Sequence, residues 1–281
     1  MLKLPDIIFS IKDKASQNIF KQLIEHYDFQ DSNQMFDNHK ILINKNIRLV
    51  TIEQDLIFAD YIDVLNSDLF IFASRHKSES GNPSLLTHCT GNWNNEADFG
   101  GEPRTLGYSS GSAIKTALIE LFRQKKLLEL DQFNVNLEVS HHGPTKLATP
   151  LVFIELGSTP EDWKNESGGL AVANAIMKVA SSKTVYKNYI GIGGPHYAQK
   201  FTDLVSNQDN DLSISHVVPK YMLDYFDKEM LIQTIKRSKE PLEAFLLDWK
   251  GMTSEQRDRV IKLLELKNYK YLKAKSIKLE S

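Results

Sequence analysis

Cysteine is almost absent from this chain, since Cys89 is the only one among 281 residues. A single cysteine excludes an intramolecular disulfide and a zinc site made of four thiolates, and it is typical of a protein from a reducing compartment. A metal site would therefore have to be built from histidine and carboxylate side chains. Nucleophilic chemistry at Cys89 would require an activating base and a lowered pKa, and no pattern around this residue indicates either.

Long hydrophobic runs are also absent. No stretch approaches the run of about 18 apolar residues that a membrane span requires, although the apolar fraction of 41% is ordinary for a globular protein. The short apolar run within residues 1–14 has acidic residues on both sides, which favours a first β-strand over a signal peptide. We therefore predict a cytoplasmic protein that makes no contact with a membrane.

Two familiar catalytic signatures are missing from the sequence. No Gly-Lys-Ser/Thr sequence follows the glycine-rich segment near residue 193, which disfavours nucleotide hydrolysis at a P-loop. No G-x-S-x-G elbow is present, which disfavours a serine hydrolase of the α/β type.

The chain has no strong excess of either charge, because its formal net charge is −2 at pH 7. This balance disfavours nucleic-acid binding by bulk electrostatics alone. The distribution is uneven, however, since residues 257–281 contain eight Lys or Arg against three Asp or Glu, a local excess of five positive charges. This segment is either a solvated basic tail or a contact surface for a phosphate backbone, and the sequence leaves both interpretations open.

Short apolar runs alternate with stretches of helical periodicity through most of the chain. After the first strand, the pattern predicts strands at 47–53, 135–140, 151–156, 185–192 and 213–218, and helices at 13–29, 112–129, 168–181 and from about 195, with Pro195 in the first turn. Such alternation is typical of an α/β fold with a mostly parallel or mixed central sheet and helices on both faces.

We predict a single α/β domain over residues 1–281, with two distinctive segments. The stretch of about 75–111 is rich in Gly, Asn, Ser and Pro without a sustained period, so it is predicted to be a long binding loop. The segment of about 220–281 is predicted to be helical and basic, with helical patterns at 220–235, 241–249 and 254–267 and an alternating tail typical of an edge strand.

Histidines gather where the predicted strands end. Four apolar runs, within 68–78, 135–145, 151–163 and 189–197, stop abruptly in a cluster of His, Gly or small polar residues. Open α/β sheets bind ligands beyond the carboxyl ends of their strands, so the repeated pattern predicts an active site. Six of the eight histidines lie at such strand ends or in the loop beside them: His76, His88, His141, His142, His196 and His216.

The segment SHHGPT, residues 140–145, is the strongest single indication of chemistry. Two adjacent histidines at a strand end point in different directions, so one can face the sheet interior while the other faces the crevice. Neutral imidazole is a common metal ligand and a proton-transfer group at neutral pH. A His-His pair alone also occurs as a structural hydrogen-bonding feature, but the other strand-end histidines favour a metal or proton-transfer site.

Two further motifs extend the candidate site. Glu155 lies inside the buried run VFIEL, where a carboxylate must be paired, protonated or metal-bound, and Glu138 is placed to orient an imidazole. GIGGPHY places Gly193 and Gly194 between a strand and His196. Backbone N–H groups there are suited to a phosphate, a carboxylate or an oxyanion, although the same pattern also forms a plain tight turn.

Basic and amide side chains flank the same junctions. The basic residues are Arg75, Lys77, Arg104 and Lys146. Together they predict a positive rim for a phosphate-rich substrate. In the predicted loop, Asn92 is a candidate oxyanion donor or substrate contact.

Five segments together resemble one known family. They are S-R-H-K-S (74–78), H-C-T-G-N-W (88–93), H-H-G-P-T (141–145), E-L-G-S-T-P-E-D-W (155–163) and G-G-P-H-Y (193–197). The set resembles the archaeal and plant-type D-aminoacyl-tRNA deacylases in order along roughly residues 1–270. The resemblance implies a zinc-dependent esterase that cleaves the bond between a D-amino acid, such as D-tyrosine, and the terminal ribose of tRNA. It also implies a fold like those of peptidyl-tRNA hydrolase and nucleoside phosphorylase.

On this resemblance, the site residues are assigned as follows. The expected catalytic residues are His141, His142, Glu155 and His196, and the expected Zn²⁺ ligands are drawn from His88, His141, His142 and His196. The expected substrate-binding residues are Arg75, Lys77, Asn92, Lys146, Gly193 and Gly194. We expect a monomer, since no coiled-coil pattern is present. Another zinc-dependent hydrolase of a small ester or amide, and a non-catalytic RNA-binding protein with structural histidines, remain as alternatives.

Overall fold

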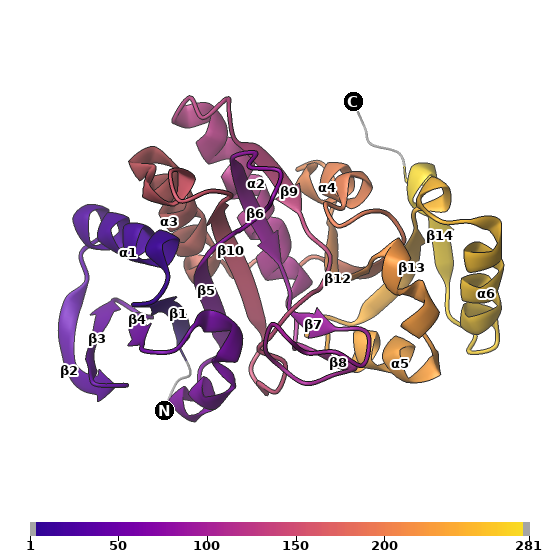
Figure 1. Ribbon diagram of the computed structural model, residues 1–281, viewed down its shortest axis with the longest axis horizontal. Coiled ribbons are helices and arrows are strands. Elements are labelled where there is room, and N and C mark those ends of the chain that lie inside the picture. Colours follow the sequence, from indigo (N-terminus) through magenta and orange to yellow (C-terminus); the bar gives the residue numbers. More distant parts are fainter. Residues whose placement is uncertain (1–3, 278–281) are drawn as a thin grey trace.

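The computed structural model describes residues 4–277, in which strands and helices alternate along most of the chain (Figure 1). The strands are β1 (Pro5–Ser10), β2 (Gln30–Phe36), β3 (His39–Asn44), β4 (Ile47–Ile52), β5 (Leu69–Arg75), β6 (Ser84–His88), β7 (Gly91–Asn92), β8 (Thr105–Leu106), β9 (Asn134–Leu137), β10 (Leu151–Gly157), β11 (Lys187–Ile192), β12 (Leu212–Val218), β13 (Leu242–Leu247) and β14 (Tyr271–Lys273). The α-helices are α1 (Lys14–His26), α2 (Gly111–Leu127), α3 (Glu166–Ser181), α4 (Gln199–Ser206), α5 (Lys228–Lys236) and α6 (Ser254–Glu265). Short 3₁₀ helices are η1 (Leu56–Phe58), η2 (Asp60–Leu65), η3 (Asp162–Lys164), η4 (Lys220–Tyr225), η5 (Trp249–Gly251) and η6 (Ala274–Ser276).

The larger sheet has eight strands in the order β2-β3-β4-β1-β5-β10-β6-β9. Strands β4, β1, β5 and β10 run parallel to one another, whereas β6 and β9 run in the opposite direction to β10. Helices α1, α2 and α3 pack on one another and against the sheet (Figure 1). Large side chains of the central strands, including Phe70, Phe72 and Phe153, are fully buried. These features confirm the predicted α/β fold with a mixed, largely parallel sheet.

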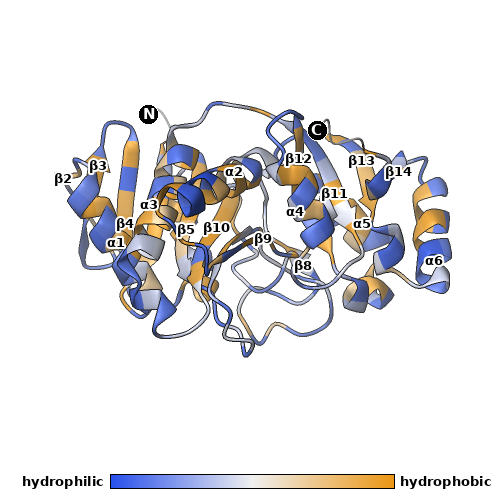
Figure 2. Ribbon diagram, turned by 90° about the horizontal axis from the view of Figure 1, so that it is seen from above, coloured by the Kyte–Doolittle hydropathy of each residue, from blue (hydrophilic) through white to orange (hydrophobic). Residues whose placement is uncertain are grey.

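A second sheet of four parallel strands, in the order β12-β11-β13-β14, lies beside the first (Figure 1). It has its own hydrophobic cluster, which includes Ile190 of β11, Phe245 of β13 and Leu264 of α6. Helix α6 carries bands of hydrophobic and hydrophilic residues (Figure 2), as expected for a helix with one face on a core.

Backbone hydrogen bonds join the two sheets. Glu138 N donates to Thr87 O of the larger sheet, and the next two residues along the chain donate to His196 O and to Val217 O on the side of the smaller sheet. Val217 also belongs to the same large hydrophobic cluster as the central strands of the larger sheet. On this ground we propose that the chain forms one domain.

Side-chain caps fix where several helices begin. Asp13 accepts a hydrogen bond from Ser16 N at the start of α1, and Ser110 accepts one from Ala113 N at the start of α2. Thr253 forms a capping box at the start of α6. Such caps satisfy backbone N–H groups that have no partner within the helix.

The structure corrects two predictions in the C-terminal half. Residues 241–249, predicted as helical, contain the strand β13, which lies between β11 and β14. A short apolar run such as LEAFLL is compatible with either a buried strand or a buried helix, so periodicity cannot separate them. Helix α4 begins at Gln199, and Pro195 lies in the preceding turn instead of the first helical turn.

The N-terminal half differs from the prediction in two places. The predicted binding loop of about 75–111 contains the core strand β6, which pairs with β10 and β9. The antiparallel hairpin of β2 and β3 is inserted between α1 and β4, where the sequence had suggested a direct passage from helix to strand.

The end of the described chain matches the prediction of an edge strand, since β14 is the last strand of the smaller sheet. Residues 278–281 of the alternating tail lie outside the described residues. Within residues 4–277, no helix is long and apolar enough to cross a membrane.

Candidate active site

Strand register places several predicted site residues on one face of the larger sheet. Glu155 of β10 lies opposite Ser74 of β5 and Leu86 of β6. Alternate residues of a strand share a face, so His76 and His88, two positions farther along their strands, point to the same side as Glu155. Because β6 is antiparallel to β10, its last residue meets the middle of β10. The site therefore lies on the sheet surface where strand direction reverses.

Glu138 is the centre of the imidazole cluster, and its side chain is completely buried. Its carboxylate oxygens lie 3.0 Å from His196 Nε2, 3.5 Å from His141 Nε2, 3.7 Å from His76 Nδ1 and 3.9 Å from His88 Nε2. The sequence suggested that Glu138 orients one imidazole. In the structure it adjoins four.

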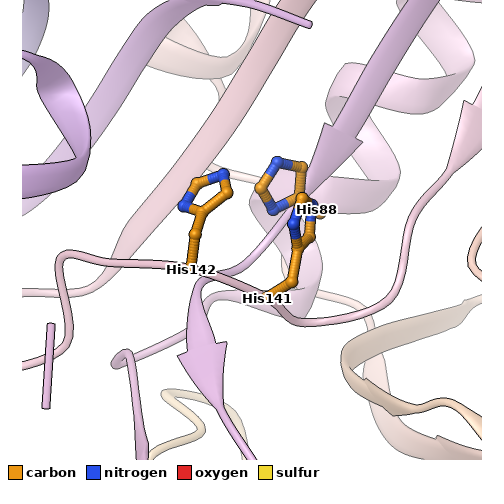
Figure 3. A group of neighbouring side chains, drawn as sticks. All are labelled: His88, His141 and His142. Carbon is orange, nitrogen blue, oxygen red and sulfur yellow. The ribbon is translucent and has the colours of Figure 1, made fainter. Parts of the chain in front are cut away.

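The turn after β9 brings the predicted histidine pair to this cluster. The rings of His141 and His142 gather beside His88 (Figure 3), with centroids 4.3 Å apart for His88 and His141 and 4.4 Å apart for His141 and His142. His196, which follows β11 of the smaller sheet, has its ring centroid 4.7 Å from that of His141. Together with His76, five of the six strand-end histidines meet at one place.

Backbone carbonyls fix the tautomers of two imidazoles. His88 Nδ1 lies 3.0 Å from Cys89 O, and His142 Nδ1 lies 2.6 Å from Gly143 O. A carbonyl oxygen only accepts hydrogen bonds, so Nδ1 carries the proton in both rings. Nε2 of each neutral ring is then left with a free lone pair, which is the arrangement that prepares an imidazole for metal binding.

Tyrosine hydroxyls orient the imidazoles that do not bond to carbonyls in this way. Tyr197 Oη lies 2.9 Å from His76 Nε2, and Tyr221 Oη, from η4, lies 3.0 Å from His196 Nδ1. Burial and the nearby Glu138 charge raise the pKa of Tyr221 to about 12, so this hydroxyl keeps its proton at neutral pH.

Opposite charges concentrate on the side of the cluster next to β10. Burial opposes ionisation of Glu138 and Glu155, but the imidazoles beside them hold the pKa of both carboxyls well below the usual range. Burial likewise opposes protonation of His76, yet the hydrogen bond to Glu155 and the charge of Glu138 raise its pKa to about 10. The same carboxylates raise the pKa of His88 against the effect of burial.

The pKa values of His141 and His142, the two histidines of the turn, are lowered instead of raised. Burial and the neighbouring His88 lower the pKa of His141 to about 4, and burial with the adjacent His141 holds the pKa of His142 well below its ordinary value. Without a metal ion, therefore, the carboxylates favour the protonated forms of His76 and His88, whereas His141 and His142 favour their neutral forms.

Several buried polar atoms at the centre make no hydrogen bond within the described structure: both carboxylate oxygens of Glu138, His88 Nε2 and His141 Nε2. Leaving such atoms unpaired costs free energy, and native structures rarely do so without a bound partner. Three groups of side chains place possible ligand atoms within 4.8 Å of one another: His88, His141 and His142; Glu138, His141 and His196; and His76, Glu138 and Glu155. Their nitrogen and oxygen donors fit a divalent metal ion.

The turn that carries the histidine pair is held in an uncommon conformation. His142 has a φ of +46°, a left-handed value that is costly for a residue with a side chain. Gly143 follows it, and a Cβ at this position would lie 2.3 Å from Gly101 N and 2.5 Å from Ile57 O. Gly143 N also donates to Phe99 O at 3.0 Å. The turn is thus clamped against the backbone of the loop 94–104.

A cavity of about 800 Å³ opens onto the cluster. Site residues on its wall include His76, His141, His142, Glu155 and His196. Of the predicted substrate-binding residues, Arg75, Lys77 and Asn92 also line it. Both N–H donors of the Asn92 side chain are engaged, by Gly100 O at 2.8 Å and Glu102 O at 3.1 Å, so this side chain shapes the loop 94–104.

The structure places three other predicted substrate-binding residues away from this cavity. Gly193 and Gly194 line a separate cavity of about 310 Å³, and their N–H groups donate to Val218 O and Gly251 O. Lys146 is exposed and forms an ion pair with Glu102.

Two residues of interest lie outside the cluster. His216 is buried beneath the turn, where Nδ1 lies 3.1 Å from Ser140 Oγ and Nε2 lies 3.0 Å from Arg237 O. Burial lowers its pKa to about 4, so it is neutral. Cys89 is buried in the hydrophobic core, and burial raises the pKa of its thiol to about 12, which excludes a thiolate nucleophile at neutral pH.

Sequence reasoning missed part of the site. His76 was recognised as a strand-end histidine but received no role, and Glu138 was treated as peripheral. Its position three residues before the histidine pair was the available signal. Tyr221 lies in η4, after β12, and no sequence pattern indicated its contact with His196.

Comparisons with known proteins agree with this picture. A sequence model of the D-aminoacyl-tRNA deacylase family matches residues 64–272. The D-aminoacyl-tRNA deacylases of Pyrococcus furiosus and Methanosarcina acetivorans are each 38% identical to the chain, over 87% and 97% of its length and over 90% and 93% of their own. The crystal structure of a conserved protein of unknown function has a TM-score of 0.88 and 28% identity, covering 98% of this chain and 96% of its own. The chain therefore belongs to the D-aminoacyl-tRNA deacylase family.

Proposed function

We propose that this protein hydrolyses the ester bond of D-aminoacyl-tRNA, releasing the free D-amino acid and tRNA, and that it does so with bound Zn²⁺. Family membership supports the reaction. The observation that supports the metal is the set of unpaired buried atoms on Glu138, His88 and His141, which converge at the centre of the cluster. Nitrogen and oxygen donors without a thiolate are ligands that Zn²⁺ accepts.

The residues that would hold the ion are those whose lone pairs are already aimed at the centre. His88 and His142 offer Nε2 because their Nδ1 protons are bound to carbonyls. His141 shares a possible ligand group with both of them, and a second group with Glu138 and His196. When bound, Zn²⁺ supplies a Lewis acid that polarises a carbonyl oxygen and lowers the pKa of water.

The protein's own side chains supply proton transfer. An aminoacyl ester is already activated, so no covalent intermediate with the enzyme is needed. Glu155 is ionised and lines the cavity, where its carboxylate is placed to take a proton from an attacking water. His196 Nε2, beside Glu138 and oriented by Tyr221, is placed to deliver a proton to the departing ribose oxygen.

The wall of the cavity carries charges of both signs, and its carboxylates include Asp13, Asp55 and Glu79. Arg75 and Lys77 form a basic part of its wall, and Arg75 is held by Asp55 at 3.4 Å. The basic segment that begins at Arg257 contributes no lining residue within the described chain. We therefore assign phosphate contact at the site to Arg75 and Lys77, and the C-terminal segment remains outside the site.

The decisive experiment compares D-tyrosyl-tRNA with L-tyrosyl-tRNA as substrates for the purified protein, before chelation, after chelation and after addition of zinc. We expect cleavage of the D-ester only, its loss on chelation and its return with zinc. Equal activity after complete removal of metal would overturn the zinc assignment. Cleavage of small esters without dependence on tRNA would favour a general hydrolase, and RNA binding without cleavage would favour a non-catalytic protein.

We also propose that the protein acts as a monomer in the cytoplasm, where its tRNA substrate is used in translation. Size-exclusion chromatography with light scattering tests the first part. A mass near 32.1 kDa supports it, and a concentration-independent dimer would contradict it.

A further inference from the structure

Phe99 is a large apolar side chain left in water at the edge of the active-site cavity. It is 70% exposed although it lines the same cavity as His142 and Glu155. The apolar side chains Leu56, Ile57 and Trp93 share this wall. Single exposed apolar residues are common on protein surfaces, but one at the mouth of a ligand cavity offers a contact surface to the ligand.

Backbone contacts hold the main chain of Phe99 in place at the edge of the cavity. Phe99 O accepts a hydrogen bond from Gly143 N, directly after His142. The next residue, Gly100, has a φ of +82°, and a Cβ there would lie 2.0 Å from Ile57 O. The backbone that carries the ring is therefore bonded to the turn that carries the histidine pair, and both Phe99 and His142 line the same cavity.

The charge around Phe99 restricts what it can meet. Glu96 and Asp98 lie on the same loop, are exposed and line the same cavity. Two carboxylates disfavour a phosphate group at this place. The basic residues of the cavity are Arg75, the last residue of β5, and Lys77, just after it, so they lie on a different segment of its wall. The part of an RNA end that suits the Phe99 side is therefore a flat and uncharged one.

We propose that Phe99 is a stacking platform for the unpaired terminal base of the tRNA substrate. This inference rests on the proposed function, because it assigns a place to one part of the same substrate. The base is joined to the reacting ester through its own ribose, so a platform anchored next to His142 holds the ester beside the imidazole cluster. Stacking of a base on an aromatic ring requires no base-specific hydrogen bond, so Phe99 is a binding residue without a step in the chemistry.

The test is a double-mutant cycle in binding, which does not depend on turnover. The probe is an RNA hairpin that carries no amino acid and has a single-stranded 3′ end. It is compared with the same hairpin in which the last nucleotide keeps its ribose but lacks its base. Wild type, Phe99→Ala and Phe99→Trp are titrated with both. Phe122→Ala is the matched control, because Phe122 is a partly exposed phenylalanine of α2 that does not line the cavity.

For wild type, we expect removal of the base to weaken binding on the order of 10- to 100-fold. Phe99→Ala should weaken binding of the intact hairpin by a similar factor and leave binding of the base-free hairpin unchanged. Phe99→Trp should restore affinity, and Phe122→Ala should behave as wild type. The proposal would be overturned if removal of the base weakened binding equally in wild type and in Phe99→Ala. It would also be overturned if wild type showed no measurable binding of the intact hairpin.

Deacylation of D-tyrosyl-tRNA by the wild type, measured in parallel, keeps the two proposals apart. If the wild type cleaves the D-ester but the effects of Phe99→Ala and of base removal on binding are additive, the stacking role of Phe99 is rejected and the deacylase function is kept. Absence of cleavage together with strong coupling between Phe99 and the base would reject the deacylase reaction and keep the base-binding site.

Discussion

The imidazole cluster has a buried half and an open half, which differ in charge and in access. The buried half consists of His76, His88, Glu138 and Glu155, with side chains at most 7% exposed. The open half consists of His141, His142 and His196, with His141 28% and His196 38% exposed. In the buried half, the two carboxylates raise the pKa of His76 and of His88 and so favour the protonated imidazoles. In the open half, burial lowers the pKa of His141 and of His142, which both line the cavity.

The two halves perform different tasks: the buried half holds the cluster in position, and the open half is accessible to substrate. Buried groups with several partners are fixed in position, and removal of one leaves a buried charge without compensation. Groups of the open half are partly exposed to solvent, so their removal costs less folding free energy. The comparison therefore predicts which substitutions damage stability and which damage only chemistry.

Glu138 belongs to the buried half but contacts both halves, so its replacement should have the largest effect. In Glu138→Gln the carboxylate charge disappears beside four imidazoles. We expect deacylation to fall by roughly 10²- to 10⁴-fold and metal affinity by about 10- to 100-fold. Single-turnover cleavage and metal content by mass spectrometry measure the two effects. Glu120→Gln, a buried glutamate of α2 outside the site, is the control, and wild-type metal affinity in Glu138→Gln would refute a role in binding the ion.

A paired comparison of His88→Ala and His196→Ala tests the division itself. Both variants should lose deacylase activity. Only His88→Ala should lose much stability, about 2–4 kcal/mol, because it creates a cavity and strands the charges of Glu138 and Glu155. For His196→Ala we expect a loss below about 1 kcal/mol. Urea unfolding of the metal-free proteins measures both values, and similar losses in the two variants would contradict the division.

The last prediction concerns pH and His216, which supports the turn of the open half from below. Its folded pKa of about 4 lies below the ordinary value of 6.5, so between these values the unfolded chain binds a proton that the folded chain does not. Stability from this group is therefore complete above pH 6.5 and is lost as the pH falls toward 4, by up to about 3 kcal/mol.

Replacement by glutamine removes this titration. The free energy of unfolding of His216→Gln should fall less steeply than that of wild type between pH 6.5 and 4, when both are measured by urea unfolding in the presence of chelator. Parallel curves for the two proteins would show that His216 does not titrate in this range.

The parts of the molecule that could be predicted are those governed by local pattern. Strand-end histidines such as His76 and His141 were recognisable because apolar runs of strand length end beside them, and buried strands bring their ends together. β13 was mistaken for a helix because uniform burial removes the periodicity that separates the two. Glu155 was recognisable because a carboxylate in a buried apolar run requires a partner.

The parts that could not be predicted depend on contacts between distant segments. Glu138 became the centre of the cluster only because β6 and β9 reverse direction next to β10, and register between strands is not written in either strand alone. Tyr221 meets His196 through the parallel pairing of β11 and β12. Gly193 and Gly194 were given an anion-binding role, and the sequence could not show that their N–H groups are engaged by Val218 and Gly251.

Residues 138–140, whose backbone hydrogen bonds join the two sheets, bring side chains from two distant chain segments together in the imidazole cluster. A break at the exposed connection 183–185, between α3 and β11, would leave the histidine pair on one fragment and His196 on the other. Neither fragment would carry the complete set of side chains around Glu138. The two fragments would make a split reporter, because cleavage activity would return only when they associate. A chain truncated at this connection would carry only part of the cluster.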